Sequence, residues 1–137
     1  MRFMILVKAT ADSEAGVMPP EGLLAGMGAF HEELARAGVL QGGNGLKASS
    51  AGFRVRYDGS ARHVIDGPFS ESKALIAGYT MIQVRSREEA LAWARRYPNP
   101  SIDGGAAEIE VRQLFELEDF GPSAAVDRMR AAEARPQ

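Results

Sequence analysis

The hydrophobic spacing along the chain predicts strands alternating with helices. Residues 2–8 contain the continuous apolar run FMILV, which is typical of a strand buried on both faces. Residues 53–57 alternate between apolar and polar side chains, and Asp58 and Gly59 then form a hairpin-turn signal before a returning strand. The predicted strands cover residues 2–8, 39–47, 53–57, 62–65, 75–84 and 107–117, the glycine-rich 39–47 being irregular and bulged.

Two longer segments have the spacing of amphipathic helices, and residues 10–20 between them and the first strand are expected to form a loop. The first helix is predicted over residues 20–37 and ends at Gly38; its apolar stripe is formed by Leu23, Met27, Phe30 and Leu34. The second opens at the capping-box sequence SREE, residues 86–89. Its inner face would hold Ala90, Trp93, Ala94 and Tyr97, which are expected to be core residues. Residues 122–135 are predicted to form a short exposed helix.

The order of these elements indicates an α+β fold. A strand–helix–strand unit, a hairpin and a second strand–helix–strand unit form the ferredoxin-like plan: a split β-α-β sandwich with an inserted β-hairpin. Two helices can cover only one face of its sheet, whereas the strand at 75–84 is apolar on both faces. A second copy of the chain is the simplest cover for the other face, so we predict a face-to-face homodimer.

Composition narrows the chemistry. The 137 residues include no cysteine, and 16 Lys+Arg against 18 Asp+Glu leave a net charge of −2. Without cysteine there are no disulfides, zinc–thiolate sites or cysteine nucleophiles, and the mild acidity argues against binding nucleic acid or an anionic membrane. No segment has the pattern of a spanning helix or a secretory signal, so a cytoplasmic protein is expected.

His31 is the first candidate for chemistry. It lies at the border of the apolar stripe of the first helix, four residues after Met27. A histidine at such a border can reach both core and cleft and can transfer a proton near neutral pH. The alternative is a structural histidine at the boundary of the core.

Asp66 ends the predicted strand at 62–65 and precedes Gly67 and Pro68, which make a rigid extended corner. The structural interpretation is a turn in which the Asp66 carboxylate accepts backbone N–H groups. The functional interpretation is that the corner directs Asp66 or Glu71 toward His31, where a carboxylate could orient the imidazole or act as a base. Both interpretations can hold together.

Three cations are candidates for binding a negatively charged substrate. Lys73 would share a side with Glu71 if the segment is extended, so it could hold a substrate oxygen or simply form a surface ion pair. Arg54 and Arg56 share one face of the hairpin and could bind a carboxylate or phosphate, or form a solvated strand face. Nothing in the spacing of His31 and His63 requires a metal, and no cofactor is predicted.

A family resemblance rests on residues 66–73, DGPFSESK, with Gly78 and Tyr79 in the following strand. GVL at 38–40 precedes them, and EVR at 110–112 and EDF at 118–120 follow. This arrangement resembles the YCII-related family, in its DGPF-domain branch. The resemblance covers about residues 1–120, which leaves 121–137 as a helical or disordered tail. It implies a dimeric α+β barrel of two ferredoxin-like subunits, with a cleft between sheet and first helix.

The resemblance also implies candidate roles. A His–Asp dyad is proposed for the wider family; His31 lies about one turn later than the family histidine, and Tyr97 stands before Pro98, where the family has the aspartate. The family includes a dehydrochlorinase-type enzyme acting on a hydroxylated aromatic, and DGPF members are often encoded near extracytoplasmic sigma factors. The first hypothesis is therefore an acid–base enzyme for a small polar or aromatic molecule. The alternative is a non-catalytic ligand-binding or regulatory module.

Overall fold

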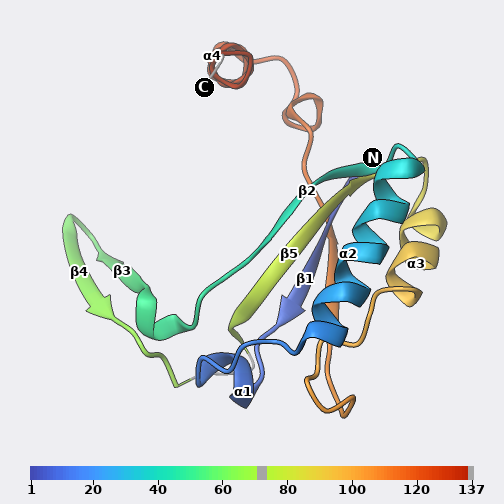
Figure 1. The fold of residues 1–137 in the computed structure, drawn as a ribbon. Helices are drawn as coiled ribbons and strands as arrows, with labels where there is room; N and C mark the ends of the chain where they lie inside the picture. The colour runs from blue at the N-terminus through green and yellow to red at the C-terminus, as the bar shows by residue number, and fades with distance from the viewer. Residues whose placement is uncertain (71–73, 136–137) are drawn as a thin grey trace.

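The computed structural model describes residues 1–70 and 74–135 and contains one four-stranded sheet and one two-stranded sheet (Figure 1). The larger sheet has the strand order β2-β5-β1-β6, and each neighbouring pair is antiparallel. Its strands are β1 (Arg2–Lys8), β2 (Leu40–Gly45), β5 (Ile76–Gln83) and β6 (Ile109–Gln113). The chain is thus a mixed α+β protein with antiparallel sheets, as the pattern of elements predicts.

Two helices cover one face of the larger sheet: α2 (Glu21–Arg36) and α3 (Arg87–Arg95) (Figure 1). The core between helices and sheet is formed by Phe3, Ile5, Phe30, Leu34, Val39, Ile82, Val84 and Ala90. Trp93 and Tyr97 pack against this core, as the helical spacing predicts. Apolar burial at this single interface is the main stabilising contribution to the domain.

The sequence explains where both helices begin and end. Pro20 precedes the first turn of α2, where its missing N–H costs no hydrogen bond, and Gly38 follows the helix with a φ of 74°. The Ser86 side chain accepts a hydrogen bond from the backbone N–H of Glu89 and caps α3. In the same turn the Glu89 carboxylate accepts from the N–H of Arg85.

The opposite face of the sheet is here called the outer face, and none of the helices in residues 1–70 and 74–135 lies against it in Figure 1. Met4 pairs with Met81 and Leu6 pairs with Tyr79, so these four side chains share that face. All four are half-buried. The apolar second face predicted from the sequence is therefore present.

The inserted hairpin forms the second sheet. Strands β3 (Phe53–Asp58) and β4 (Ala61–Asp66) pair in register around a turn with Gly59 at a φ of 59°. Figure 1 shows this hairpin extending away from the larger sheet, on the side opposite to α2 and α3. Nearly all of its residues are exposed.

Two local expectations need correction. The predicted loop at 10–20 contains a short helix, α1 (Ala11–Glu14), because Thr10 and Ser13 form a capping box. Strand β6 ends at Gln113 rather than near residue 117, and the chain then turns into the 3-10 helix η3 (Leu117–Phe120). Helix α4 (Ala124–Glu133) follows, and a further 3-10 turn, η1 (Ser49–Ala51), precedes the hairpin. No helix in the described ranges is long and apolar enough to cross a membrane.

Candidate functional site

His31 is half-buried on α2, and each of its ring nitrogens has a hydrogen-bond partner. Nδ1 lies 2.8 Å from the carbonyl oxygen of Met27, one helical turn earlier. Nε2 lies 3.0 Å from the hydroxyl oxygen of Thr80 on β5. Since α2 crosses the sheet at this point, the imidazole bridges the helix and the central part of β5.

These two contacts assign the protons of the ring. A backbone carbonyl can only accept, so Nδ1 must carry the proton that it donates to Met27. In the neutral ring, Nε2 then has a free lone pair and accepts a hydrogen bond from the Thr80 hydroxyl. The Met27 carbonyl therefore orients the imidazole, a role that sequence analysis had given to a carboxylate.

The contact continues to a third side chain. The Thr80 hydroxyl oxygen lies 3.2 Å from the phenol oxygen of Tyr97, so it can accept from Tyr97 while donating to His31. Burial raises the pKa of the Tyr97 phenol, and the hydrogen bond to Thr80 lowers it by a smaller amount. The three residues form a continuous chain of hydrogen bonds, named here the His31 relay.

The surroundings of the relay are aromatic. Phe30 contacts the rings of His31 and Tyr97 edge-on, with centroid distances of 6.1 and 5.2 Å. Thr80 is only 1% exposed, so its hydroxyl depends on these protein partners rather than on water. Because this buried hydroxyl has both His31 and Tyr97 as partners, its hydrogen bonds fix the geometry of the relay.

Gly43 borders the relay on the neighbouring strand β2. A Cβ at Gly43 would lie 2.7 Å from the carbonyl oxygen of Tyr79 and 3.4 Å from the Thr80 hydroxyl. Glycine at this position therefore lets β2 approach β5 closely. A side chain at position 43 would therefore press on the β5 backbone beside Thr80.

His31 is predicted as a candidate from the sequence, but its partner Thr80 is not. Thr80 is a single hydroxyl on the apolar, helix-facing side of β5, between Gly78 and Ile82. That isolated polar position was the available signal. Tyr97 was assigned to the core; its ring does pack there, but its hydroxyl belongs to the relay.

The DGPF corner is built by contacts with two residues that sequence analysis did not single out. The Ser49 hydroxyl donates to Glu14, at 2.5 Å, and accepts from the backbone N–H of Phe69, at 3.0 Å. The Ser49 N–H also donates to Glu14, at 2.9 Å. These bonds lower the pKa of the Glu14 carboxyl, the side-chain bond most strongly.

Gly67 is required at this corner for steric reasons. Its N–H donates to the carbonyl of Gly52 at 3.0 Å, and a Cβ at Gly67 would overlap the Ser49 carbonyl oxygen. The expected bonds from backbone N–H groups to the Asp66 carboxylate are not found among the described residues. The corner is held by Ser49 and Gly52 instead.

The structure places the remaining predicted site residues apart from the relay. Asp66 ends β4 in the projecting hairpin, so within this chain it does not meet His31 (Figure 1). Arg54 and Arg56 share a face of the hairpin as predicted, and the Arg54 guanidinium lies 3.9 Å from the centre of the Phe69 ring. Glu71 and Lys73 lie outside the described residues.

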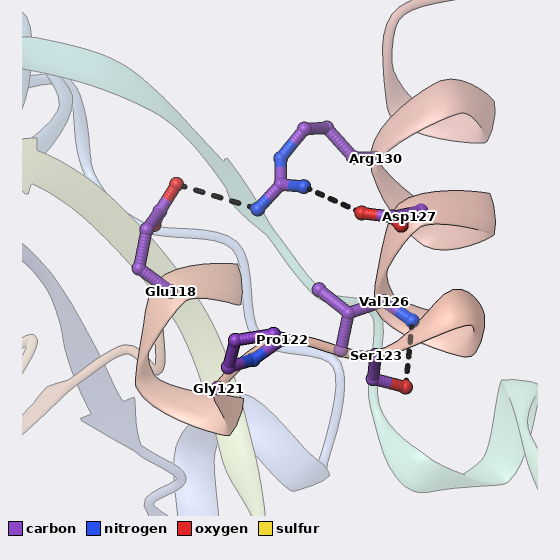
Figure 2. A pocket seen from close by; sticks show the side chains of 7 residues that line it. All are labelled: Glu118, Gly121, Pro122, Ser123, Val126, Asp127 and Arg130. Carbon is purple, nitrogen blue, oxygen red and sulfur yellow. Dashed lines mark hydrogen bonds and ion pairs between the residues drawn. The ribbon is translucent and has the colours of Figure 1, made fainter.

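Two shallow hollows lie in the C-terminal part of the chain rather than at the relay. The larger is bounded by η3 and α4, where Pro122 and Val126 lie to one side of the ion pair of Glu118 and Arg130 (Figure 2). The smaller is lined by Gln113, Leu114, Phe115 and Asp119. Within the described ranges, no three His, Asp or Glu side chains converge in an arrangement that could hold a metal ion.

Comparison with known proteins decides the family. The YCII-related domain matches residues 1–116 of the chain. The chain belongs to the YCII-related family. In this YCII-related protein the match ends before η3, so η3 and α4 lie beyond the matched region.

Two known proteins are similar to this chain over most of its length. An uncharacterized protein of Rhizobium meliloti (strain 1021) is 28% identical over 96 residues, which is 70% of this chain and 77% of that protein. A solved structure of 5-chloro-2-hydroxyhydroquinone dehydrochlorinase from Burkholderia phenoliruptrix, in complex with 2,5-dihydroxybenzoquinone, covers 84% of this chain and 94% of its own. Its sequence identity is 16% and its TM-score is 0.46.

The site of this YCII-related protein differs from the dyad that the resemblance implies. A phenol, Tyr97, occupies the position before Pro98, and it reaches His31 only through Thr80. Within this chain the side chain before Pro98 therefore contacts His31 indirectly, through the Thr80 hydroxyl.

Proposed function

We propose that this protein is an enzyme that uses general acid–base chemistry on a small polar or aromatic molecule. The observation that carries the proposal is the His31 relay, in which a half-buried imidazole is connected through Thr80 to Tyr97. A histidine in such a chain can gain or lose a proton near neutral pH without large rearrangement of its partners.

The relay suggests a balanced proton transfer. The Tyr97 oxygen takes a proton from the substrate while its own proton moves to the Thr80 oxygen. The Thr80 proton moves in turn to Nε2 of His31, which becomes an imidazolium. Tyr97 does not become a phenolate in this step, which fits the raised pKa of its phenol. The reverse transfer would return a proton to the product.

We further propose that the working unit is a cytoplasmic homodimer of two ferredoxin-like subunits that pack their sheets together. The half-buried apolar residues of the outer face, Met4, Leu6, Tyr79 and Met81, support this arrangement. Asp66 could act at the relay only if dimerisation brought a DGPF corner to it. The same holds for Arg54 and Arg56 as substrate-binding groups. Two roles stay predictions from the sequence: that Glu71 is a carboxylate partner of His31, and that Lys73 binds a negatively charged group of the substrate.

Native mass spectrometry of the purified protein, followed by turnover assays of any molecule that co-purifies, tests the proposal. His31→Gln should abolish turnover, whereas His63→Gln, in the exposed hairpin, provides the matched control. Full turnover by the His31 variant would contradict the role given to the imidazole.

The second candidate is a ligand-binding or regulatory module. It is favoured by the hydrogen bonds that already occupy both nitrogens of His31. Such a module would bind the co-purifying molecule and release it unchanged. Product analysis after prolonged incubation separates the two functions.

A further inference from the structure

One face of the β3–β4 hairpin is apolar and uncovered. Cross-strand pairing places Phe53, Val55, Tyr57 and Val64 on the same face, named here the apolar hairpin face. Their exposed fractions are 66%, 38%, 69% and 66%. A two-stranded hairpin is only marginally stable alone in water, so this face is expected to contact a partner.

The apolar hairpin face carries one cation, Arg62, near the turn, and one carboxylate, Asp66, which lies opposite Phe53 at the other end of the hairpin. Arg62 lies directly opposite Tyr57, and its guanidinium is 4.4 Å from the centre of that ring. Among the described residues Arg62 donates only to backbone carbonyls, those of Gly59 and Ala61. Arg62 therefore presents a cation, next to an aromatic ring, that no carboxylate of the described chain neutralises.

The C-terminal arm, residues 115–135, carries the complementary features. Phe115 and Phe120 stack at 5.1 Å and are 73% and 56% exposed. Between them lie Glu118 and Asp119, both exposed. The arm thus presents two aromatic rings with acidic side chains, whereas the turn end of the hairpin presents the Tyr57 ring with Arg62.

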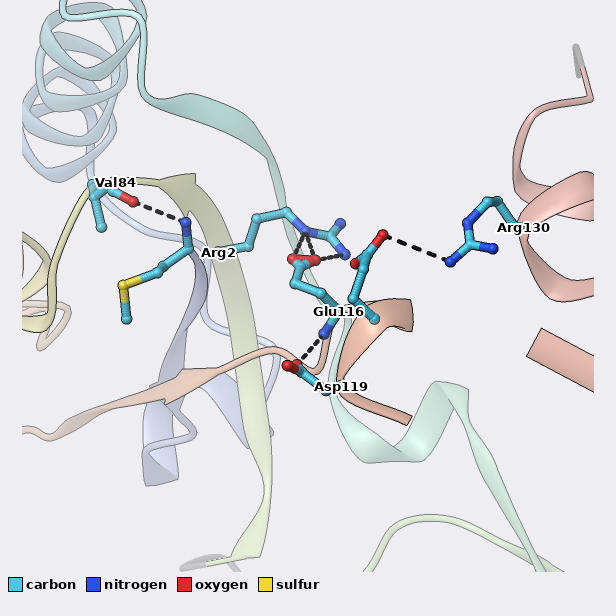
Figure 3. Close-up of polar contacts among 7 residues, drawn as sticks. Arg2, Val84, Glu116, Asp119 and Arg130 are labelled. Carbon is cyan, nitrogen blue, oxygen red and sulfur yellow. Dashed lines mark hydrogen bonds and ion pairs between the residues drawn. The ribbon is translucent and has the colours of Figure 1, made fainter. Parts of the chain in front are cut away.

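The arm is held firmly at its root. Glu116 accepts from Arg2 on β1 at 2.7 and 2.9 Å, and its N–H donates to Asp119 at 2.7 Å (Figure 3). Val126 of α4 is 7% exposed, and Arg130 pairs with Glu118 at 3.6 Å. The aromatic pair is therefore displayed on an ordered support.

The hairpin and the arm cannot contact one another within one chain, because Figure 1 shows them at different ends of the molecule. In a dimer with twofold symmetry, any contact from hairpin to arm occurs twice. We propose that the apolar hairpin face of each subunit docks on the Phe115–Phe120 pair of a second copy, with Arg62 facing Glu118. This inference rests on the proposed homodimer and adds its specific contact.

The absence of cysteine makes cross-linking a direct test. Tyr57→Cys and Phe120→Cys chains, carrying different tags, are mixed and treated with a short bis-maleimide. We expect a covalent heterodimer. Leu91→Cys on α3 replaces Phe120→Cys as the control, because Leu91 is 42% exposed but lies on the helical side of the sheet.

The outcomes of this experiment distinguish a wrong hairpin–arm contact from a wrong homodimer. Suppose that light scattering shows a dimer, but that the Tyr57→Cys chain cross-links to the Phe120→Cys chain no better than to the Leu91→Cys chain. The hairpin–arm contact is then wrong, and the homodimer stands. If light scattering at micromolar concentration shows a monomer, both are wrong. Cross-linking specific to position 120 supports both.

Charge reversal gives a second measurement. Arg62→Glu should raise the dimer Kd by about tenfold, since it places like charges together. Arg56→Glu, on the opposite hairpin face, should have a smaller effect. Combining Arg62→Glu with Glu118→Arg should restore most of the affinity. Equal loss in both hairpin variants, or no recovery in the double variant, would contradict the assigned pairing.

Discussion

The Nε2 atom of His31 lies 3.0 Å from the hydroxyl of Thr80, which joins α2 to β5 across 49 positions of sequence. Thr80 is buried, and its hydroxyl also contacts Tyr97, which lies just beyond the end of α3. The Thr80 hydroxyl therefore links β5 to both α2 and the residues that follow α3. These hydrogen bonds hold the helices on the sheet and, in the proposed enzyme, also provide a route for a proton.

Removing this hydroxyl should destabilise the fold. Thr80→Val keeps the side-chain shape but leaves Tyr97 and His31 without their shared partner, so we expect a loss of about 1–3 kcal/mol in the free energy of unfolding. Thr80→Ser keeps the hydroxyl and loses one methyl group, which should cost about 1 kcal/mol. Urea unfolding of both variants measures the difference. A valine variant as stable as the serine variant would show that the hydrogen bonds contribute little.

The raised pKa of Tyr97 predicts a specific loss of stability in alkali. The folded state holds the phenol neutral, whereas the unfolded chain ionises it above about pH 10. The contribution of Tyr97 to the free energy of unfolding is therefore fully present below the pKa of the phenol in the unfolded chain. It is lost as the pH rises toward the higher pKa of the phenol in the folded protein. Tyr97→Phe should show a shallower decline of unfolding free energy above pH 10. Identical slopes for wild type and variant would contradict the assignment.

The Glu14–Ser49 contact predicts a loss of folding stability at acidic pH. Because the pKa of Glu14 is lowered in the folded state, its contribution is present above the unfolded value, about 4.3, and is lost as pH falls through the folded one. Glu14→Gln should flatten the profile of unfolding free energy against pH in that acidic window. Glu133→Gln, in exposed α4, is the control.

The Ser49 hydroxyl makes a second prediction. Hydrogen exchange at the Phe69 amide should quicken in Ser49→Ala, which removes its acceptor.

Gly67 should tolerate no side chain. In Gly67→Ala the new Cβ would overlap the Ser49 carbonyl, so the corner must shift, at a cost of about 1–3 kcal/mol or more. Gly45→Ala is the matched control, because nothing lies within 4 Å of a Cβ built there. Thermal unfolding of the two variants gives the comparison. Similar melting temperatures would indicate that the corner is more adaptable than its packing suggests.

Local structure followed closely from sequence. The stripe from Leu23 to Leu34 and the cap at Ser86 are local patterns, since side-chain spacing and capping act within one or two turns. The hairpin was predicted for the same reason. Helix α1 was missed because its stabilising Thr10–Ser13 pair is short and lies in a segment rich in turn-forming residues.

The candidate site depended on longer-range contacts. His31 could be selected because its place at the edge of an apolar stripe is a local property. Its partner could not, because Thr80 and Tyr97 reach it only after α2 and α3 pack on the same face of the sheet. The proposed carboxylate at Asp66 was separated from His31 by the direction of the hairpin, which strand alternation does not specify.

By itself, the sequence determined the α+β class, the helices and strands, the two apolar sheet faces and the absence of thiol chemistry, because these depend on composition and on spacing between near neighbours. Tertiary structure alone decided that Met27 orients His31, that Thr80 links it to Tyr97, and that Ser49 holds the DGPF corner. Those contacts join side chains distant in the chain. Their geometry is set by how the helices and the loops pack against the sheet, which no local pattern encodes.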